Sequence, residues 1–127
     1  MKIVQVIDYF VHPCLITSEQ LAAEKPAGSV LFSGKDEYLA PAVIHGAEGG
    51  IGVWATVFPR AYVAIFRYAR AGKLAEAFAL QRVLNALCCR VLRYGLLSGY
   101  AAIRHYLGLH ERVFRAPQPQ FDPDTYD

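Results

Sequence analysis

The sequence predicts an α/β fold, in which short buried strands alternate with helices along a chain of 127 residues. Apolar runs at positions 2–7, 29–32 and 51–55 have the length of buried strands. No charge interrupts the last run, as expected where both faces of a parallel sheet are covered. Helical patterns separate and follow these runs, and such alternation is typical of parallel strands joined by right-handed crossovers.

Local signals delimit the elements of the first half. Thr17 or Ser18 can cap a short helix over positions 19–24, because a hydroxyl accepts a bond from a free helix N–H. The Lys-Pro-Ala-Gly run at 25–28 predicts a turn before the second strand. A helix is expected from about Asp36 to His45, with Asp36 and Glu37 at its positive end. Glycines 49 and 50 predict a turn into the third strand.

Three further helices are expected, over about 59–71, 74–94 and 98–107, each closed by a glycine. The middle helix carries an apolar stripe of period 3.6, which predicts its buried face. The stripe comprises Leu80, Val83, Leu84, Leu87, Cys88, Val91 and Leu92. Beyond position 110 three prolines interrupt the pattern. We therefore predict one folded domain over 1–110 and an extended tail over 111–127.

Composition excludes several classes of protein. A net charge of +2 gives little attraction for nucleic acid, and the arginines of the second half alternate with apolar positions as on a solvated helix face. Every long apolar stretch contains an arginine, so no membrane span is expected. The three cysteines, Cys14, Cys88 and Cys89, form neither a metal motif nor an even disulfide framework. A cytoplasmic, reduced protein is the expectation.

One stretch carries a family resemblance. Ser33-Gly34-Lys35-Asp36-Glu37 is followed by Gly-Ala-Glu-Gly-Gly-Ile-Gly at 46–52 and by Arg-Ala-Gly-Lys-Leu-Ala-Glu-Ala at 70–77. This order resembles the N-acetylneuraminate lyase / dihydrodipicolinate synthase family of (β/α)8 TIM-barrel aldolases. A complete barrel of this kind needs roughly 200 residues or more. The resemblance therefore implies a partial barrel, comprising about strands six to eight and extra C-terminal helices.

The resemblance also implies the chemistry. Lyases of this family form a Schiff base between a lysine on the sixth strand and pyruvate or a related 2-oxo acid, without a further cofactor. The amine must be unprotonated to attack. Ile7 stands near the expected lysine position, and no lysine occurs between Lys2 and Lys25. The chain alone is therefore expected to be a truncated, inactive form.

The same resemblance implies a substrate-binding surface. Gly34, Asp36 and Glu37 match positions that contact the polyol of a sugar acid, where carboxylates can accept hydroxyl hydrogen bonds. Ile51 would line the pyruvate end, and Val53 replaces a serine of the sialic-acid branch. The simpler alternative is that Asp36 and Glu37 only cap a helix.

Lys35 raises a separate possibility, because it directly precedes Asp36 and would lie at the mouth of the seventh strand. A displaced Schiff-base lysine is one hypothesis. A solvated lysine paired with Asp36 or Glu37 is the simpler one.

Three functions stay open at this point. The first is the C-terminal portion of a lyase barrel, which self-associates or pairs with a complementary barrel half because its sheet edges are open. The second is a non-catalytic module that binds a sugar acid or 2-oxo acid, or that serves oligomerisation. The third is a small independent α/β domain.

Overall fold

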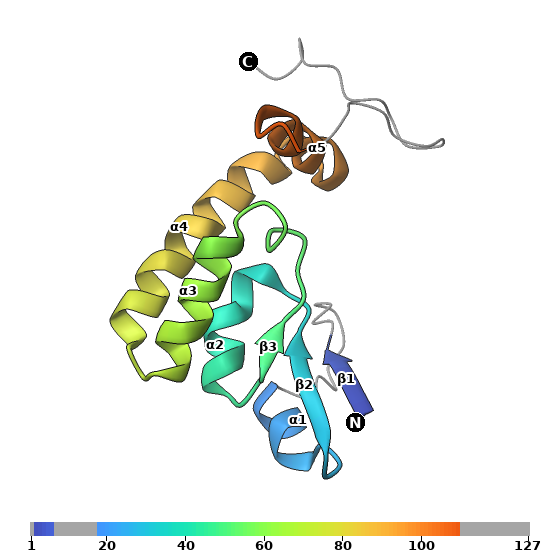
Figure 1. Cartoon of the computed structure of the whole chain (residues 1–127), viewed down its shortest axis with the longest axis vertical. Coiled ribbons are helices and arrows are strands. Elements are labelled where there is room, and N and C mark those ends of the chain that lie inside the picture. The colour runs from blue at the N-terminus through green and yellow to red at the C-terminus, as the bar shows by residue number, and fades with distance from the viewer. Residues whose placement is uncertain (1, 7–17, 110–127) are drawn as a thin grey trace. The chain divides into compact units, whose positions relative to one another are not determined.

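The computed structural model describes residues 2–6 and 18–109, and these residues divide into two compact units after Asn85. The first unit holds three parallel strands in the order β1-β2-β3 (Figure 1). They are β1 (Lys2–Val6), β2 (Ser29–Ser33) and β3 (Gly49–Gly50). The α/β class expected from the sequence is observed. The boundary predicted near residue 110 lies at the edge of the described residues and stays a prediction.

Four helical segments accompany the strands of the first unit, together with the first half of α4. They are α1 (Ser18–Glu24), the 3-10 turn η1 (Asp36–Tyr38), α2 (Leu39–Ile44) and α3 (Pro59–Arg70). α4 covers Leu74–Leu92 and therefore continues into the second unit, which also holds α5 (Leu96–Tyr106). The predicted helices are present with bounds that differ by one or two residues, except that positions 36–38 of the helix expected over 36–45 form the 3-10 turn η1. The glycine ends are confirmed, since Gly72, Gly95 and Gly108 have positive φ.

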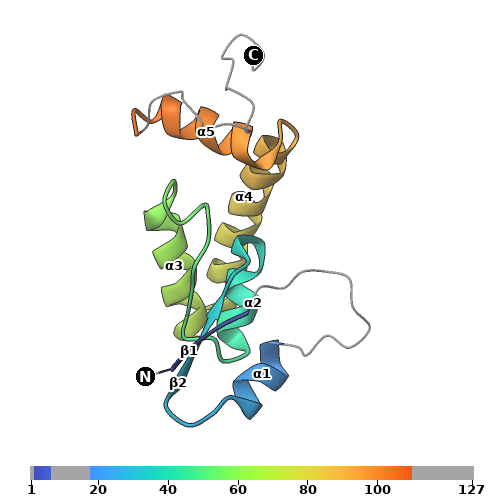
Figure 2. The ribbon, with the colours of Figure 1, turned by 90° about the vertical axis from the view of Figure 1, so that its right-hand side faces the viewer.

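The core of the first unit lies between β2 and its helices. Leu31 of β2, Ala42 of α2 and Ala47 are each about 1% exposed and pack together. Leu21 and Ala22 of α1 cover this cluster, and Figure 2 shows α1 beside the beginning of β2.

The two faces of β2 differ. Ser29, Leu31 and Ser33 are buried, whereas Val30 and Phe32 are only partly buried. Side chains alternate between the faces of a strand. One face of β2 is therefore covered by helices, and the other remains partly open within the described residues.

Glu48, directly before β3, joins the start of this strand to β2. Its backbone N–H donates to Leu31 O at 2.8 Å, and its carboxylate accepts the Leu31 N–H at 2.7 Å. Lys25 forms an ion pair with the same carboxylate and donates to Ser29 O at 2.9 Å. The hydrogen bond from Lys25 lowers the pKa of Glu48 below its usual range, with the Leu31 N–H adding to the effect.

The third strand was predicted wrongly. Residues 51–55, expected as a strand, form a bend and turn, while Gly49 and Gly50, expected as a turn, are β3. The reason lies in close packing against Phe32 of β2 and Leu39 of α2. A Cβ at Gly49 would lie 2.8 Å from the Phe32 ring, and one at Gly50 would lie 2.7 Å from Leu39. A side chain at either position would have to displace its neighbours, so glycine suits this part of the sheet although its strand propensity is low.

The apolar stripe predicted for α4 was also partly wrong. Val83 is 59% exposed and Leu87 is 39% exposed, whereas Leu84 and Cys88 are buried as expected. The buried face of α4 instead follows four residues at helical spacing, and one of them is polar. These residues are Ala77, Gln81, Leu84 and Cys88.

Candidate functional site

The candidate site is the segment that follows β2, residues 33–38, which we call the mouth segment. Ser33 Oγ accepts the Lys35 N–H at 3.3 Å and donates to Lys35 O at 3.3 Å, so the chain turns directly after the strand. η1 then leads into α2. Asp36 and Glu37 thus stand where a parallel strand ends, which is the usual side for ligands in α/β folds.

The carboxylate of Asp36 points into the protein. The residue is 6% exposed, and its Oδ2 accepts the Trp54 N–H at 3.3 Å. Neither η1 nor α2 has a side-chain cap hydrogen bond at its start. The Asp36 carboxylate therefore makes no helix-cap hydrogen bond, and it instead holds the loop between β3 and α3.

Tyr62 of α3 faces the same buried region. Neither its hydroxyl nor Asp36 Oδ1 has a hydrogen bond of normal geometry within the described residues, although the two groups are close enough to influence each other. Burial raises the pKa of Asp36 above its ordinary 3.8, and this outweighs the N–H groups of Trp54 and Val53. Burial, together with the nearby Asp36 carboxylate, also raises the pKa of Tyr62. Asp36 and Tyr62 thus form a buried polar pair.

The other expected site residues lie nearer the surface. Gly34 and Glu37 are partly buried. Ile51 is 52% exposed and Val53 is 39% exposed, on the loop that Asp36 holds. Ile7 lies outside the described residues. The structure therefore brings the loop of Ile51 and Val53 to the mouth segment through the Asp36–Trp54 hydrogen bond.

Lys35 is partly buried at the start of η1. The hypothesis of a displaced Schiff-base lysine is not tested by this geometry and stays a prediction.

Two residues of α4 were missed in the sequence. Gln81 is 3% exposed and binds both Ala40 and Asp36, and Asn85 binds Glu37. The sequence did contain a signal, because Gln81 lies four residues after Ala77 and three before Leu84, so the three share one face of a helix. A polar residue at such a position is expected to have buried hydrogen-bond partners.

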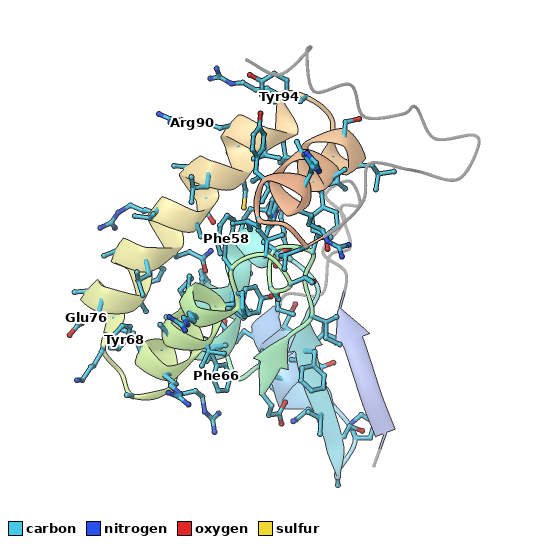
Figure 3. All side chains as sticks on the ribbon, turned by 45° about the horizontal axis from the view of Figure 1, so that its top comes forward. Phe58, Phe66, Tyr68, Glu76, Arg90 and Tyr94 are labelled. Atoms are coloured by element: carbon cyan, nitrogen blue, oxygen red, sulfur yellow. The ribbon has the colours of Figure 1, made fainter. Side chains whose placement is uncertain are left out.

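A groove of about 240 Å³ runs along β3 and α3. Phe66 lies on the side of α3 that faces this groove (Figure 3). The lining residues are Phe32, Leu39, Glu48, Gly49, Gly50, Tyr62, Val63 and Phe66. β3 is an edge strand of the described sheet, so the groove borders unpaired backbone groups.

Another hollow, of about 600 Å³, lies on the surface of α3 and is lined in part by Arg60, Arg67 and Tyr68. No group of three metal-binding side chains occurs among residues 2–6 and 18–109. In that same part of the chain, no helix is long and apolar enough to cross a membrane.

A family comparison covers most of the sequence. The model of the Dihydrodipicolinate synthetase family matches residues 14–127. N-acetylneuraminate lyase 2 of Escherichia coli O6:H1 is 30% identical over 104 residues, which are 81% of this chain and 34% of that protein. N-acetylneuraminate lyase of Salmonella paratyphi B is 31% identical over 93 residues, or 73% of this chain and 31% of that protein.

Solved structures agree with the sequence comparisons. N-acetylneuraminate lyase from Fusobacterium nucleatum superposes with a TM-score of 0.76 at 27% identity, over 84% of this chain and 36% of that one. A dihydrodipicolinate synthase homologue from Thermus thermophilus gives a TM-score of 0.72 at 32% identity, over 84% and 37%. The chain thus spans about a third of the length of these relatives.

Proposed function

Since this chain belongs to the dihydrodipicolinate synthetase family, we propose that it forms the C-terminal part of an aldolase-type (β/α)8 barrel. β1, β2 and β3 would be strands six, seven and eight. Their parallel order and the partly open second face of β2 support this assignment, because in a closed barrel that face would point inwards.

Within this barrel the chain would form the wall that recognises a 2-oxo acid or a sugar acid. The observation that carries this proposal is the position of Asp36 and Glu37 shortly after β2, with the loop of Ile51 and Val53 held to Asp36 by the Trp54 N–H. Glycine at 34 leaves backbone groups open to a ligand. Gly34, Asp36, Glu37, Ile51 and Val53 are the proposed binding residues.

The chain alone would not perform the Schiff-base reaction. A lysine amine must condense with the ketone of the 2-oxo acid, and the positions from Ile3 to Glu24 contain no lysine. Ile7 near the expected position cannot form an imine. The lysine, and the other strands, would have to come from residues beyond this sequence or from a complementary chain.

A non-catalytic binding module is the second candidate function. This function is favoured because the mouth segment keeps both carboxylates, Asp36 and Glu37, whereas β1 has no lysine near its C-terminal end. The two candidates differ in their requirement for a partner, because a binding module responds to its ligand alone.

The test uses the full chain and two readouts. Thermal unfolding, followed by the single tryptophan, is measured with N-acetylneuraminate and with pyruvate. A ligand that binds only the folded state raises the midpoint. We expect stabilisation by at least one of them, and absence of a response to both would overturn the binding proposal.

The second readout addresses the Schiff base. Borohydride treatment in the presence of pyruvate is followed by mass spectrometry, with Lys35→Arg as the control variant. We expect no reduced adduct on the chain alone. An adduct that disappears in Lys35→Arg would contradict the proposed inactivity and support Lys35 as a displaced nucleophile.

A further inference from the structure

The start of α2 lacks the usual local cap. Tyr38, at the N-cap position, makes no side-chain cap hydrogen bond. The first N–H groups of a helix have no partner inside the helix and need one from elsewhere. The Ala40 N–H finds its partner in Gln81 Oε1 on α4, at 2.9 Å, although 41 positions separate the two residues.

The same glutamine also holds the mouth segment. Gln81 Nε2 donates to Asp36 O at 2.9 Å and to Asn85 Oδ1 at 2.8 Å. Asn85 Nδ2 in turn donates to Glu37 O at 3.2 Å. The backbone carbonyls of both carboxylate residues are therefore held by two amide side chains, one turn apart on α4.

The Gln81 side chain uses both of its donor hydrogens and its acceptor oxygen in this network. The Gln81 carbonyl accepts one bond and its NH₂ group donates two, as an amide can. Because Gln81 is only 3% exposed, water cannot replace these partners readily. The side chain of Asp36 is held separately by the Trp54 N–H, so the α4 network acts on the backbone of the mouth segment.

We infer that Gln81 and Asn85 are positioning residues, which hold the backbone of Asp36 and Glu37 in place at the proposed binding wall without touching a ligand. The inference rests on the proposed binding function of these carboxylates. Loss of one of these hydrogen bonds leaves a buried polar group unpaired and loosens the mouth segment, which weakens binding.

The first experiment tests the network without any ligand. Gln81→Met keeps the length of the side chain and removes its hydrogen bonds. Amide exchange of Ala40 is compared with that of Ile65 in α3, which serves as an internal reference. We expect Ala40 exchange to accelerate about tenfold or more relative to Ile65, since local opening is read site by site.

Two variants serve as controls. Gln81→Glu retains an oxygen acceptor for the Ala40 N–H but loses the donors to Asp36 O and Asn85 Oδ1, and it is expected to protect Ala40 more than Gln81→Met does. Arg82→Met changes an exposed residue of the same helix and is expected to change neither amide. Equal acceleration of Ala40 and Ile65 in Gln81→Met would indicate general destabilisation and overturn the inference.

The second experiment tests the effect on the ligand. Asn85→Leu removes the contact with Glu37 O and the acceptor of one Gln81 N–H, but it leaves the Ala40 hydrogen bond in place. We expect affinity for N-acetylneuraminate to fall about threefold in Asn85→Leu and about tenfold in Gln81→Met. Folded variants with wild-type affinity would overturn the positioning role.

The two proposals fail in different ways. If the wild-type chain binds neither N-acetylneuraminate nor pyruvate, the proposed function fails, and Ala40 exchange still tests the network. If Gln81→Met does not fold, Asn85→Leu provides the test, and its readout is exchange of the Tyr38 and Leu39 amides, at the end of the mouth segment and at the start of α2. Unchanged exchange there would then overturn the inference.

Discussion

The carboxylate of Asp36 lies directly against the backbone of Gly52. A Cβ added at Gly52 would stand 1.7 Å from Asp36 Oδ1, far inside any allowed contact distance. The loop between β3 and α3 therefore approaches the mouth segment as closely as a backbone can, and the Trp54 N–H completes the contact.

Gly52→Ala is expected to destabilise the fold by about 2–3 kcal/mol, since the added methyl must displace a buried carboxylate. Urea unfolding followed by Trp54 fluorescence measures the effect, because Trp54 is 2% exposed and is the single tryptophan. The cost should be smaller in an Asp36→Ala background, where the clashing group is absent. Additive effects of the two substitutions would contradict the close contact.

Asp36→Asn is expected to change how stability depends on pH. Burial raises the pKa of Asp36 in the folded state above 3.8, so the folded protein holds this proton more tightly than the unfolded chain. The resulting stabilisation is full below about pH 3.8 and is lost as the pH rises through the raised pKa. Unfolding midpoints of wild type and Asp36→Asn should therefore diverge as the pH rises, in favour of the variant. Parallel curves would show that Asp36 does not titrate in this way.

Glu48 should show the opposite dependence. Its folded-state pKa lies below the ordinary 4.5, so its stabilisation is present above that value and is lost as the pH falls through the lowered pKa. Glu48→Ala also removes the acceptor of the Leu31 N–H and is expected to cost about 1–2 kcal/mol. Glu48→Gln keeps an acceptor and should cost less, because an ion pair this exposed contributes only about 1 kcal/mol or less. Equal costs for the two variants would contradict a role of the Leu31 hydrogen bond.

Self-association is the fourth expectation. β3 is an edge strand of the described sheet and borders an apolar groove, and such edges pair with other chains. Light scattering over a dilution series should show a mass that rises with concentration. Val63→Lys places a charge in the groove, where Val63 is 46% exposed, and should shift the series toward the monomer. Arg60→Lys, on the same helix outside this groove, provides the matched control.

Helices and their ends could be read from the sequence with little error. Local rules suffice there, since each of the last three helices ends at a glycine whose positive φ needs no tertiary partner. The third strand could not be read in this way. Gly49 and Gly50 have poor strand propensity, and their place in the sheet depends on the Phe32 ring and on Leu39, which only the folded chain brings near.

The sequence by itself determined the class of fold, the helices and the family pattern around Asp36 and Glu37, because these depend on residue order and local periodicity. Only the tertiary structure decided how that pattern is held. The Asp36 carboxylate turns inward to the Trp54 N–H, and Gln81 and Asn85 reach the mouth segment from more than 40 positions away. Hydrogen bonds between residues so distant in sequence form only once the folded chain brings these side chains together, and no local pattern encodes them.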